Sequence, residues 1–170
     1  MMKVNEIFLS IQGEGKSTGY PTIFIRFSGC NLRCSYCDTK YSYDEGTYMT
    51  PEEIYSKIKK YDFNRVCITG GEPLLQKEIH KLLFLLKDYE VSIETNGSVD
   101  ISNLKLDNKH RYTMDMKVPS SFESEKMKYS NFNFLRKSDE IKFVIGSRDD
   151  YEWTKNIIDK YYKSGMVTLS

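Results

Sequence analysis

Seven short segments of the chain carry the hydrophobic pattern of β-strands, with alternating or continuous apolar residues. Most are rich in Val, Ile, Phe or Thr and are bounded by Gly, Pro, Asn or Ser, as is typical of strands. The segments cover residues 4–11, 22–27, 65–69, 91–95, 111–116, 140–145 and 166–169. Their number and spacing predict that a β-sheet forms the centre of the fold.

Three further segments have the pattern and the end signals of helices. Thr50 and Pro51, followed by two glutamates, predict a helix that runs to about residue 60. Apolar residues at helical spacing predict a core-facing helix over residues 75–86. Residues 148–162 begin near two aspartates, end near lysines and precede Gly165, which predicts a third helix.

The order of these elements predicts the α/β fold class. Strands that alternate with helices form parallel βα units, because a parallel connection requires a crossover segment. Such sheets collect their functional loops at the carboxyl ends of the strands, whether the sheet is open or closed into a barrel. The chemically distinctive segments described below all follow a predicted strand.

Composition narrows the classes of protein that the chain can represent. With 170 residues, of which 39% are hydrophobic and 29% charged, we expect one globular domain over residues 1–170. The 25 basic and 24 acidic residues give a net charge of +1, so no bulk charge draws the chain to nucleic acid or to a membrane. The first residues do not form an apolar signal segment and no apolar run reaches the length of a bilayer span, which indicates a cytoplasmic protein.

Three of the four cysteines lie within eight residues, as Cys30, Cys34 and Cys37, in a C-x3-C-x2-C arrangement. A cubane iron–sulfur cluster has four irons, and three thiolates leave one iron free to bind a small molecule. The triplet therefore indicates a cluster held open for chemistry more than a closed structural site. The fourth cysteine, Cys67, lies among β-branched residues, and we expect it to pack in the core.

Two other uses of these cysteines compete with the cluster. A zinc site needs a fourth ligand, which His80 or His110 would have to supply from a distance, and only one C-x2-C pair is present. Disulfide bonds belong to oxidising compartments, which a cytoplasmic chain does not enter. His80 is interpreted as a solvated helix residue, and His110, between two basic residues, as part of a surface loop.

The cysteine triplet resembles the signature of the radical S-adenosylmethionine (SAM) superfamily, and Thr69-Gly70-Gly71-Glu72-Pro73 resembles its second motif. The resemblance implies a partial, incomplete TIM-like barrel of βα units. It also implies a [4Fe-4S] cluster on the three cysteines and S-adenosyl-L-methionine at the open iron, where reduction yields a 5′-deoxyadenosyl radical. Tyr36 would then lie beside the adenine, and Gly71 and Glu72 near the amino group of SAM. The cofactors carry out the difficult chemistry, while the protein binds, orients and excludes water.

A narrower resemblance covers the chain from about residue 4 to residue 145. Five blocks are similar to those of 7-carboxy-7-deazaguanine synthases, namely residues 8–15, 29–34, 37–39, 94–97 and 115–121. The resemblance implies conversion of 6-carboxy-5,6,7,8-tetrahydropterin to 7-carboxy-7-deazaguanine with loss of ammonia, in queuosine and 7-deazapurine biosynthesis. It also implies a magnesium ion (Mg2+) near the substrate carboxylate, a reductant such as flavodoxin or ferredoxin, and a homodimer.

The same resemblance assigns a role to individual residues. The metal ligands would be Cys30, Cys34 and Cys37 for the cluster and Thr39 for magnesium. SAM would be bound by Tyr36, Asp38, Gly71, Glu72, Glu94, Asp115 and Lys117. The substrate would be bound by Gln12, Gly13, Glu14, Arg26 and Thr69.

Residue chemistry supports several of these roles, each against a plainer alternative. Gln12 and Glu14 suit the mixed donors and acceptors of a pterin edge, although a polar turn would also contain them. Arg26 interrupts an apolar strand, where it either meets the substrate carboxylate or faces outward with Phe24. Thr39 is either a ligand of a hydrated cation or a loop cap.

The chain also departs from the family it resembles. Relatives often carry Ser-Pro-Lys where this chain has Asp115, Met116 and Lys117, so only the lysine transfers well. The family usually continues beyond Ser170 with a segment that helps to close over the substrate, so this chain is either a short form or lacks a terminal segment. The alternative functions are a radical SAM activase that generates a glycyl radical on a partner enzyme, and a non-catalytic zinc or iron–sulfur binding module.

Overall fold

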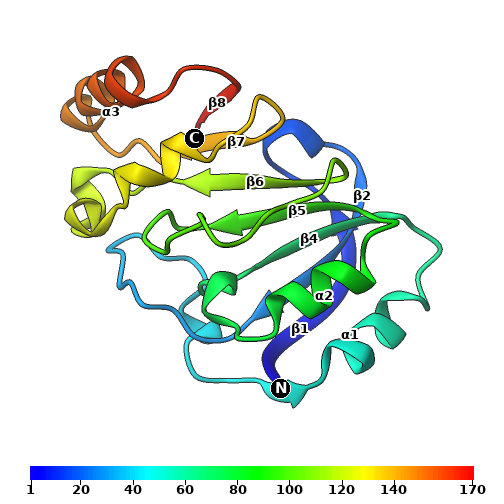
Figure 1. The fold of residues 1–170 in the computed structure, drawn as a ribbon. Helices are drawn as coiled ribbons and strands as arrows, with labels where there is room; N and C mark the ends of the chain where they lie inside the picture. The colour runs from blue at the N-terminus through cyan, green and yellow to red at the C-terminus, as the bar shows by residue number, and fades with distance from the viewer.

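The computed structural model describes all 170 residues and is built on one sheet of eight strands (Figure 1). The spatial order of the strands is β3-β1-β2-β4-β5-β6-β7-β8. Their bounds are β1 Met2–Ile11, β2 Pro21–Phe27, β3 Thr47–Met49, β4 Arg65–Gly70, β5 Glu90–Thr95, β6 His110–Asp115, β7 Glu140–Phe143 and β8 Met166–Leu169. Strands β3 and β8 form the two edges, so the sheet does not close into a full barrel. This agrees with the incomplete barrel that the resemblance implied.

Six of the strands follow the predicted parallel arrangement. β2, β4, β5, β6, β7 and β8 pair in parallel with their neighbours, which confirms the α/β fold class. β1 departs from the predicted arrangement, because it pairs antiparallel with both β2 and β3. The connection over residues 12–20 is too short for the crossover that a parallel pair requires. The short strand β3 was not predicted.

Three α-helices occupy the predicted regions: α1 Pro51–Ile58, α2 Ile79–Leu85 and α3 Arg148–Tyr161. At the start of α1, Glu53 N donates to Thr50 Oγ1 (3.2 Å) and Thr50 N donates to Glu53 Oε2 (2.7 Å), which forms a capping box. No helix in the chain is both long and apolar enough to cross a bilayer. Six short 3-10 helices complete the fold, at Gly15–Ser17, Lys40–Ser42, Pro73–Leu75, Pro119–Ser121, Ser124–Lys126 and Tyr129–Asn133.

The start of α2 differs from the sequence prediction. The periodicity places Leu75 on the buried face of a helix over residues 75–86, whereas Leu75 lies in a 3-10 turn with 45% of its surface exposed. Gln76 is extended because its amide accepts from Lys3 N and donates to Ser28 O, both at 3.0 Å. These two long-range hydrogen bonds override the local helical periodicity.

The two histidines have different environments. His80 is exposed on α2, as predicted. The prediction for His110 was wrong, because this residue is buried at the start of β6, where its Nε2 lies 3.2 Å from Leu86 O. Its basic neighbours in the sequence suggested a surface loop, but the strand places the imidazole against the end of α2.

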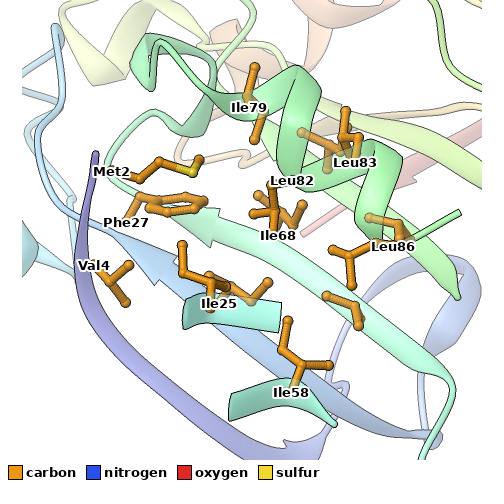
Figure 2. Packing of buried hydrophobic residues seen from close by; sticks show 14 of the residues in the cluster. Met2, Val4, Ile25, Phe27, Ile58, Ile68, Ile79, Leu82, Leu83 and Leu86 are labelled. Carbon is orange, nitrogen blue, oxygen red and sulfur yellow. The ribbon is translucent and has the colours of Figure 1, made fainter. Parts of the chain in front are cut away.

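Apolar residues fill the space between the sheet and α1 and α2. Figure 1 shows these two helices side by side on one side of the sheet. The labelled core residues in Figure 2 come from strands and helices and include Ile25, Ile68 and Leu82. A second, smaller cluster joins β6, β7 and α3, and Leu32 of the cysteine loop belongs to it. The loop that carries the three cysteines is therefore anchored in a hydrophobic core.

We expect Leu82→Ala to lower the free energy of unfolding by about 2–5 kcal/mol, because Leu82 is fully buried and its truncation leaves a cavity. Urea unfolding at constant pH measures the change. Phe84→Ala on the same helix is the control, because Phe84 is 72% exposed and its loss should cost less than about 1 kcal/mol. Equal losses for the two variants would contradict this description of the core.

Candidate active site

A cavity of about 440 Å³ opens at the carboxyl ends of the parallel strands. Fourteen residues that the sequence predicted for the site line it: Gln12, Glu14, Arg26, Cys30, Cys34, Tyr36, Cys37, Asp38, Thr39, Thr69, Gly71, Glu94, Asp115 and Lys117. Gly13 and Glu72 were predicted with them but do not line the cavity. The strands thus bring residues that are more than 100 positions apart in sequence into one site.

The cysteine loop follows β2 directly and presents all three thiols to this cavity. Cys30, Cys34 and Cys37 are half-buried, and burial raises the pKa values of the Cys30 and Cys34 thiols. Leu32, which is 1% exposed, anchors the loop in the smaller core cluster. Cys67 is fully buried in β4, as predicted.

The donor chemistry of this loop fits an iron–sulfur cluster. Three thiols from one loop face a common space, and Leu32 N (3.4 Å) and Asn96 Nδ2 (3.7 Å) donate hydrogen bonds to the Cys30 sulfur. Hydrogen bonds to the sulfurs are a regular feature of protein-bound clusters. No three His, Cys, Asp or Glu side chains in the chain are grouped so that they could hold a single metal ion.

Two glycines allow the end of β4 to approach the cysteine loop. Gly70 has a φ of 127°, and a Cβ there would lie 2.2 Å from Phe27 O. A Cβ on Gly71 would lie 2.0 Å from Gly29 O. A side chain at Gly70 would displace the end of β2, and one at Gly71 would displace the cysteine loop, so the Gly-Gly pair is required for the geometry of the cavity wall.

Asp115, Lys117 and Tyr36 form a polar group at the end of β6, next to the cysteines. Lys117 Nζ lies 3.0 Å from Asp115 Oδ2 and 5.8 Å from the centre of the Tyr36 ring. Burial lowers the pKa of Lys117, but Asp115, Cys34 and Tyr36 outweigh it and raise the pKa overall. Burial also raises the pKa of Tyr36 to about 12.

Two atoms in this group have no hydrogen-bond partner although they are buried, namely Asp115 Oδ1 and the Tyr36 hydroxyl. Buried polar atoms are normally paired, so an unpaired acceptor and an unpaired hydroxyl beside a cavity suit a polar ligand. SAM carries an ammonium group and ribose hydroxyls that can donate to such atoms. The residues present therefore fit this cofactor.

A second polar group joins Gln12, which follows β1, to β4 and β5 through Glu94. Gln12 Nε2 donates to Glu94 Oε1 (3.2 Å), and Thr69 Oγ1 donates to Glu94 Oε2 (2.7 Å). The sequence placed Glu94 with the SAM-binding residues, whereas the structure connects it to two residues predicted to bind the substrate. The three side chains form one continuous hydrogen-bonded wall.

Arg26 faces the cavity together with Phe24, on the side of β2 opposite to the buried Ile23 and Ile25. Its Nε donates to Glu6 Oε1 (2.7 Å), and its guanidinium lies 5.9 Å from the ring centre of Phe8 and 5.7 Å from that of Tyr41. The two rings and the carboxylate fix the direction of the guanidinium. An anion in the cavity would be a suitable further partner.

Thr39 and Asp38 lie on the cavity wall after the last cysteine. Thr39 Oγ1 donates to Asp38 Oδ1 (2.6 Å), so a hydroxyl and a carboxylate oxygen are adjacent. Hard cations such as magnesium prefer oxygen ligands completed by water and substrate. This pair of oxygens fits such an ion.

Lys142 of β7 is a cavity residue that the sequence reasoning missed. Its Nζ forms an ion pair with Glu14 and lies 3.8 Å from Asp115 Oδ2. The signal was a lysine flanked by apolar strand residues, Ile141-Lys142-Phe143, as Arg26 is flanked by Ile25 and Phe27. Lys142 connects a residue predicted to bind the substrate with one predicted to bind SAM.

Glu72 lies behind the cavity wall and is completely buried. Its carboxylate accepts hydrogen bonds from Asn96 N (2.7 Å), Thr95 Oγ1 (2.9 Å) and Leu74 N (3.0 Å). Burial raises the pKa of Glu72 to about 7, although these three donors oppose the rise. In this structure the carboxylate therefore joins the turns that follow β4 and β5 and does not face the cavity.

Comparison with known proteins defines the class of this protein. A model of the radical SAM superfamily matches residues 24–170, so the half-open α/β fold and the three-cysteine cavity belong to a radical SAM protein. The 7-carboxy-7-deazaguanine synthases of Clostridium acetobutylicum and Methanospirillum hungatei are 48% and 46% identical to this chain. The matches cover 98% and 99% of this chain and 79% and 72% of those proteins. The chain belongs to the 7-carboxy-7-deazaguanine synthase family.

The fold comparison agrees with the sequence relatives. The crystal structure of QueE from Escherichia coli has a TM-score of 0.81 against this chain at 25% sequence identity. That match covers 99% of this chain and 83% of the other. As a member of the radical SAM superfamily, the protein uses a [4Fe-4S] cluster and SAM as cofactors.

The free energy of unfolding of the metal-free protein should depend on pH through Glu72. The folded state holds the proton to about pH 7 and the unfolded chain only to about pH 4.5, so stability falls as pH rises through this window. The difference is on the order of 3 kcal/mol for a fully buried carboxyl. Glu72→Gln should lose this component, whereas Glu125→Gln on the surface should keep it. Urea unfolding at pH 5 and pH 7.5 measures it, and identical pH dependences for all three proteins would contradict the prediction.

Proposed function

We propose that this chain converts 6-carboxy-5,6,7,8-tetrahydropterin to 7-carboxy-7-deazaguanine with loss of ammonia. The observation that carries the proposal is the single cavity that joins the three cysteines to Gln12 and Arg26. The family supports the reaction, because the relatives that cover most of this chain are named for this product. The pathway would be that of queuosine and other 7-deazapurines.

The cavity divides into a cofactor end and a substrate end. When bound, the cluster and SAM supply the radical that starts the reaction. Cys30, Cys34 and Cys37 would hold the cluster, and Asp115 and Lys117 would bind SAM beside it. The walls of the cavity would exclude water from the reacting atoms, and its polar groups would hold the substrate in a reactive orientation.

The substrate end offers complementary partners for a carboxylated pterin. The Arg26 guanidinium would bind the substrate carboxylate, because the planar group pairs with a carboxylate through two hydrogen bonds. Glu94, held by Gln12 and Thr69, would accept hydrogen bonds from the pterin amino and N–H groups. Glu14 would add a second carboxylate to the same edge of the ring. Thr39 and Asp38 would hold magnesium at the boundary between the carboxylate and the cluster.

The remaining assignments extend the proposal beyond the cavity. Residues 1–170 would act as one radical SAM domain, in the cytoplasm, as a homodimer. A reductant such as flavodoxin or ferredoxin would supply the electron. Radical chemistry on a small molecule requires such a donor, and the superfamily match supports that requirement.

Anaerobic reconstitution followed by turnover tests the function. We expect about four irons and four sulfides per chain, and formation of 7-carboxy-7-deazaguanine and ammonia from the carboxypterin when SAM, a reductant and magnesium are present. Cys34→Ala should lose iron and activity together, whereas Cys67→Ala should keep the iron, because Cys67 lies in the core. Cleavage of SAM without any pterin product, or binding of one zinc per chain, would overturn the proposal.

Removal of the Lys142 charge should weaken substrate binding. In Lys142→Met, Glu14 loses its ion-pair partner, and we expect the dissociation constant of the carboxypterin to rise at least tenfold, or by about 1.4 kcal/mol. The affinity for SAM should change less, because Lys117 still holds Asp115. Equilibrium dialysis on the reconstituted protein measures both constants. Lys137→Met is the control, because Lys137 is exposed and outside the cavity, and an equal effect of the two substitutions would refute the role of Lys142.

A further inference from the structure

Asn96, at the first turn after β5, places its side-chain amide against the cysteine loop. Its Nδ2 donates to Cys30 Sγ (3.7 Å) and to Asn31 Oδ1 (3.1 Å). Asn96 is buried, with a relative exposure of 7% for the whole residue. Cys30 is predicted to ligate iron. The amide can donate a steady hydrogen bond to this sulfur only if its orientation is fixed.

The neighbouring groups fix the orientation of this amide. Ser98 N donates to Asn96 Oδ1 (3.0 Å), and Ser98 Oγ donates to the same oxygen (2.6 Å). A backbone N–H can only donate, so the oxygen of the amide must face Ser98 and the –NH2 group must face the sulfur. Asn31 Nδ2 donates in turn to Ser98 Oγ (2.8 Å), which closes a ring of three side chains.

The backbone of Asn96 is fixed as well. Its N–H donates to Glu72 Oε2 (2.7 Å), and Glu72 Oε1 accepts from Thr95 Oγ1 (2.9 Å). Because Glu72 is fully buried, these hydrogen bonds are shielded from water. The Asn96 amide is therefore held in position to donate to the Cys30 sulfur, with little rotational freedom.

A donor in this position acts on the charge of the sulfur. Cys30 also accepts from Leu32 N (3.4 Å), so its sulfur receives one backbone donor and one side-chain donor. Hydrogen bonds to the sulfurs stabilise the more negative, reduced state of an iron–sulfur cluster and raise its reduction potential. The side-chain donor is the part of this environment that a substitution can remove.

We propose that Asn96 tunes the reduction potential of the cluster, by donating a hydrogen bond from its oriented amide to the Cys30 sulfur. The proposal rests on the proposed function, because it requires that Cys30 ligate the cluster. Asn96 is a positioning and tuning residue, since it acts on the cluster through Cys30. Asn31 and Ser98 hold the amide in place, and Glu72 holds the backbone.

Potentiometric titration of the anaerobically reconstituted protein, followed by the electron paramagnetic resonance signal of the reduced cluster, tests this proposal. Asn96→Asp keeps the shape of the side chain but replaces the donor with a carboxylate. We expect its reduction equilibrium to fall at least tenfold, which is about 59 mV for a one-electron couple. Asn96→Ala removes the donor without adding charge, and we expect a shift of at least threefold in the same direction. Ser98→Ala removes one of the two groups that orient the amide and should produce a smaller shift of the same sign.

The controls separate tuning from a general effect of charge or folding. Asn103→Asp adds the same charge at an exposed position and should leave the potential unchanged. Iron and sulfide contents and circular dichroism report whether each variant assembles its cluster. If the clusters are intact and the reduction equilibrium constants of both Asn96 variants lie within twofold of the parent value, the proposal is overturned. Loss of the cluster from both would also overturn it, because Asn96 would then be needed for assembly.

The titration also separates this proposal from the proposed function. It is performed without the pterin, so a failure to form 7-carboxy-7-deazaguanine does not affect the potential. Normal turnover with an unchanged potential would refute only the role of Asn96. Absence of a cubane cluster in the parent protein would refute both.

Discussion

The close backbone contact between the end of β4 and the cysteine loop is the constraint on which the site depends. Gly71 N donates to Phe27 O (3.0 Å), and Glu72 N donates to Gly29 O (2.8 Å). These bonds continue the parallel pairing of β2 and β4 beyond the strands themselves. The cysteine loop is thus an extension of the sheet on one side and, through Leu32, part of a hydrophobic core on the other. Such support explains how a loop can present three thiols in a fixed arrangement.

The interior of the cavity is charged, and most of its charges have partners within the protein. Lys117 is paired with Asp115, Lys142 with Glu14, and Arg26 with Glu6. Buried charges without partners would be strongly destabilising, so these pairs permit a polar cavity in a small domain. Asp115 is paired through Oδ2 only, and its other oxygen, Oδ1, is buried without a hydrogen-bond partner. This distribution of charged groups favours a ligand that carries both hydrogen-bond donors and a carboxylate.

The sequence predicted most of the strands and cavity residues, because each is marked by a local pattern or motif. It did not predict features that depend on contacts between residues far apart in the sequence. Gln76 ends the helical periodicity because it bonds to Lys3 and Ser28, which no local pattern reveals. His110 is buried by the end of α2, although its sequence neighbours are basic. Lys142, like Arg26, is a basic residue between two apolar strand residues, but it lies in no recognised motif.

Glu72 and Asn96 illustrate what a motif alone does not reveal. In the sequence, Gly70-Gly71-Glu72 and Glu94-Thr95-Asn96 are separate segments, and each acidic residue was predicted to contact SAM. In the structure the carboxylate of Glu72 binds the backbone of Asn96, and the amide of Asn96 binds the sulfur of Cys30. The two segments therefore act as one unit that connects two strand ends to the cysteine loop. Glu72 does not line the cavity, but it can in this way influence the position of the Asn96 amide beside the Cys30 sulfur, because its hydrogen bond to Asn96 N lies in a buried part of the fold.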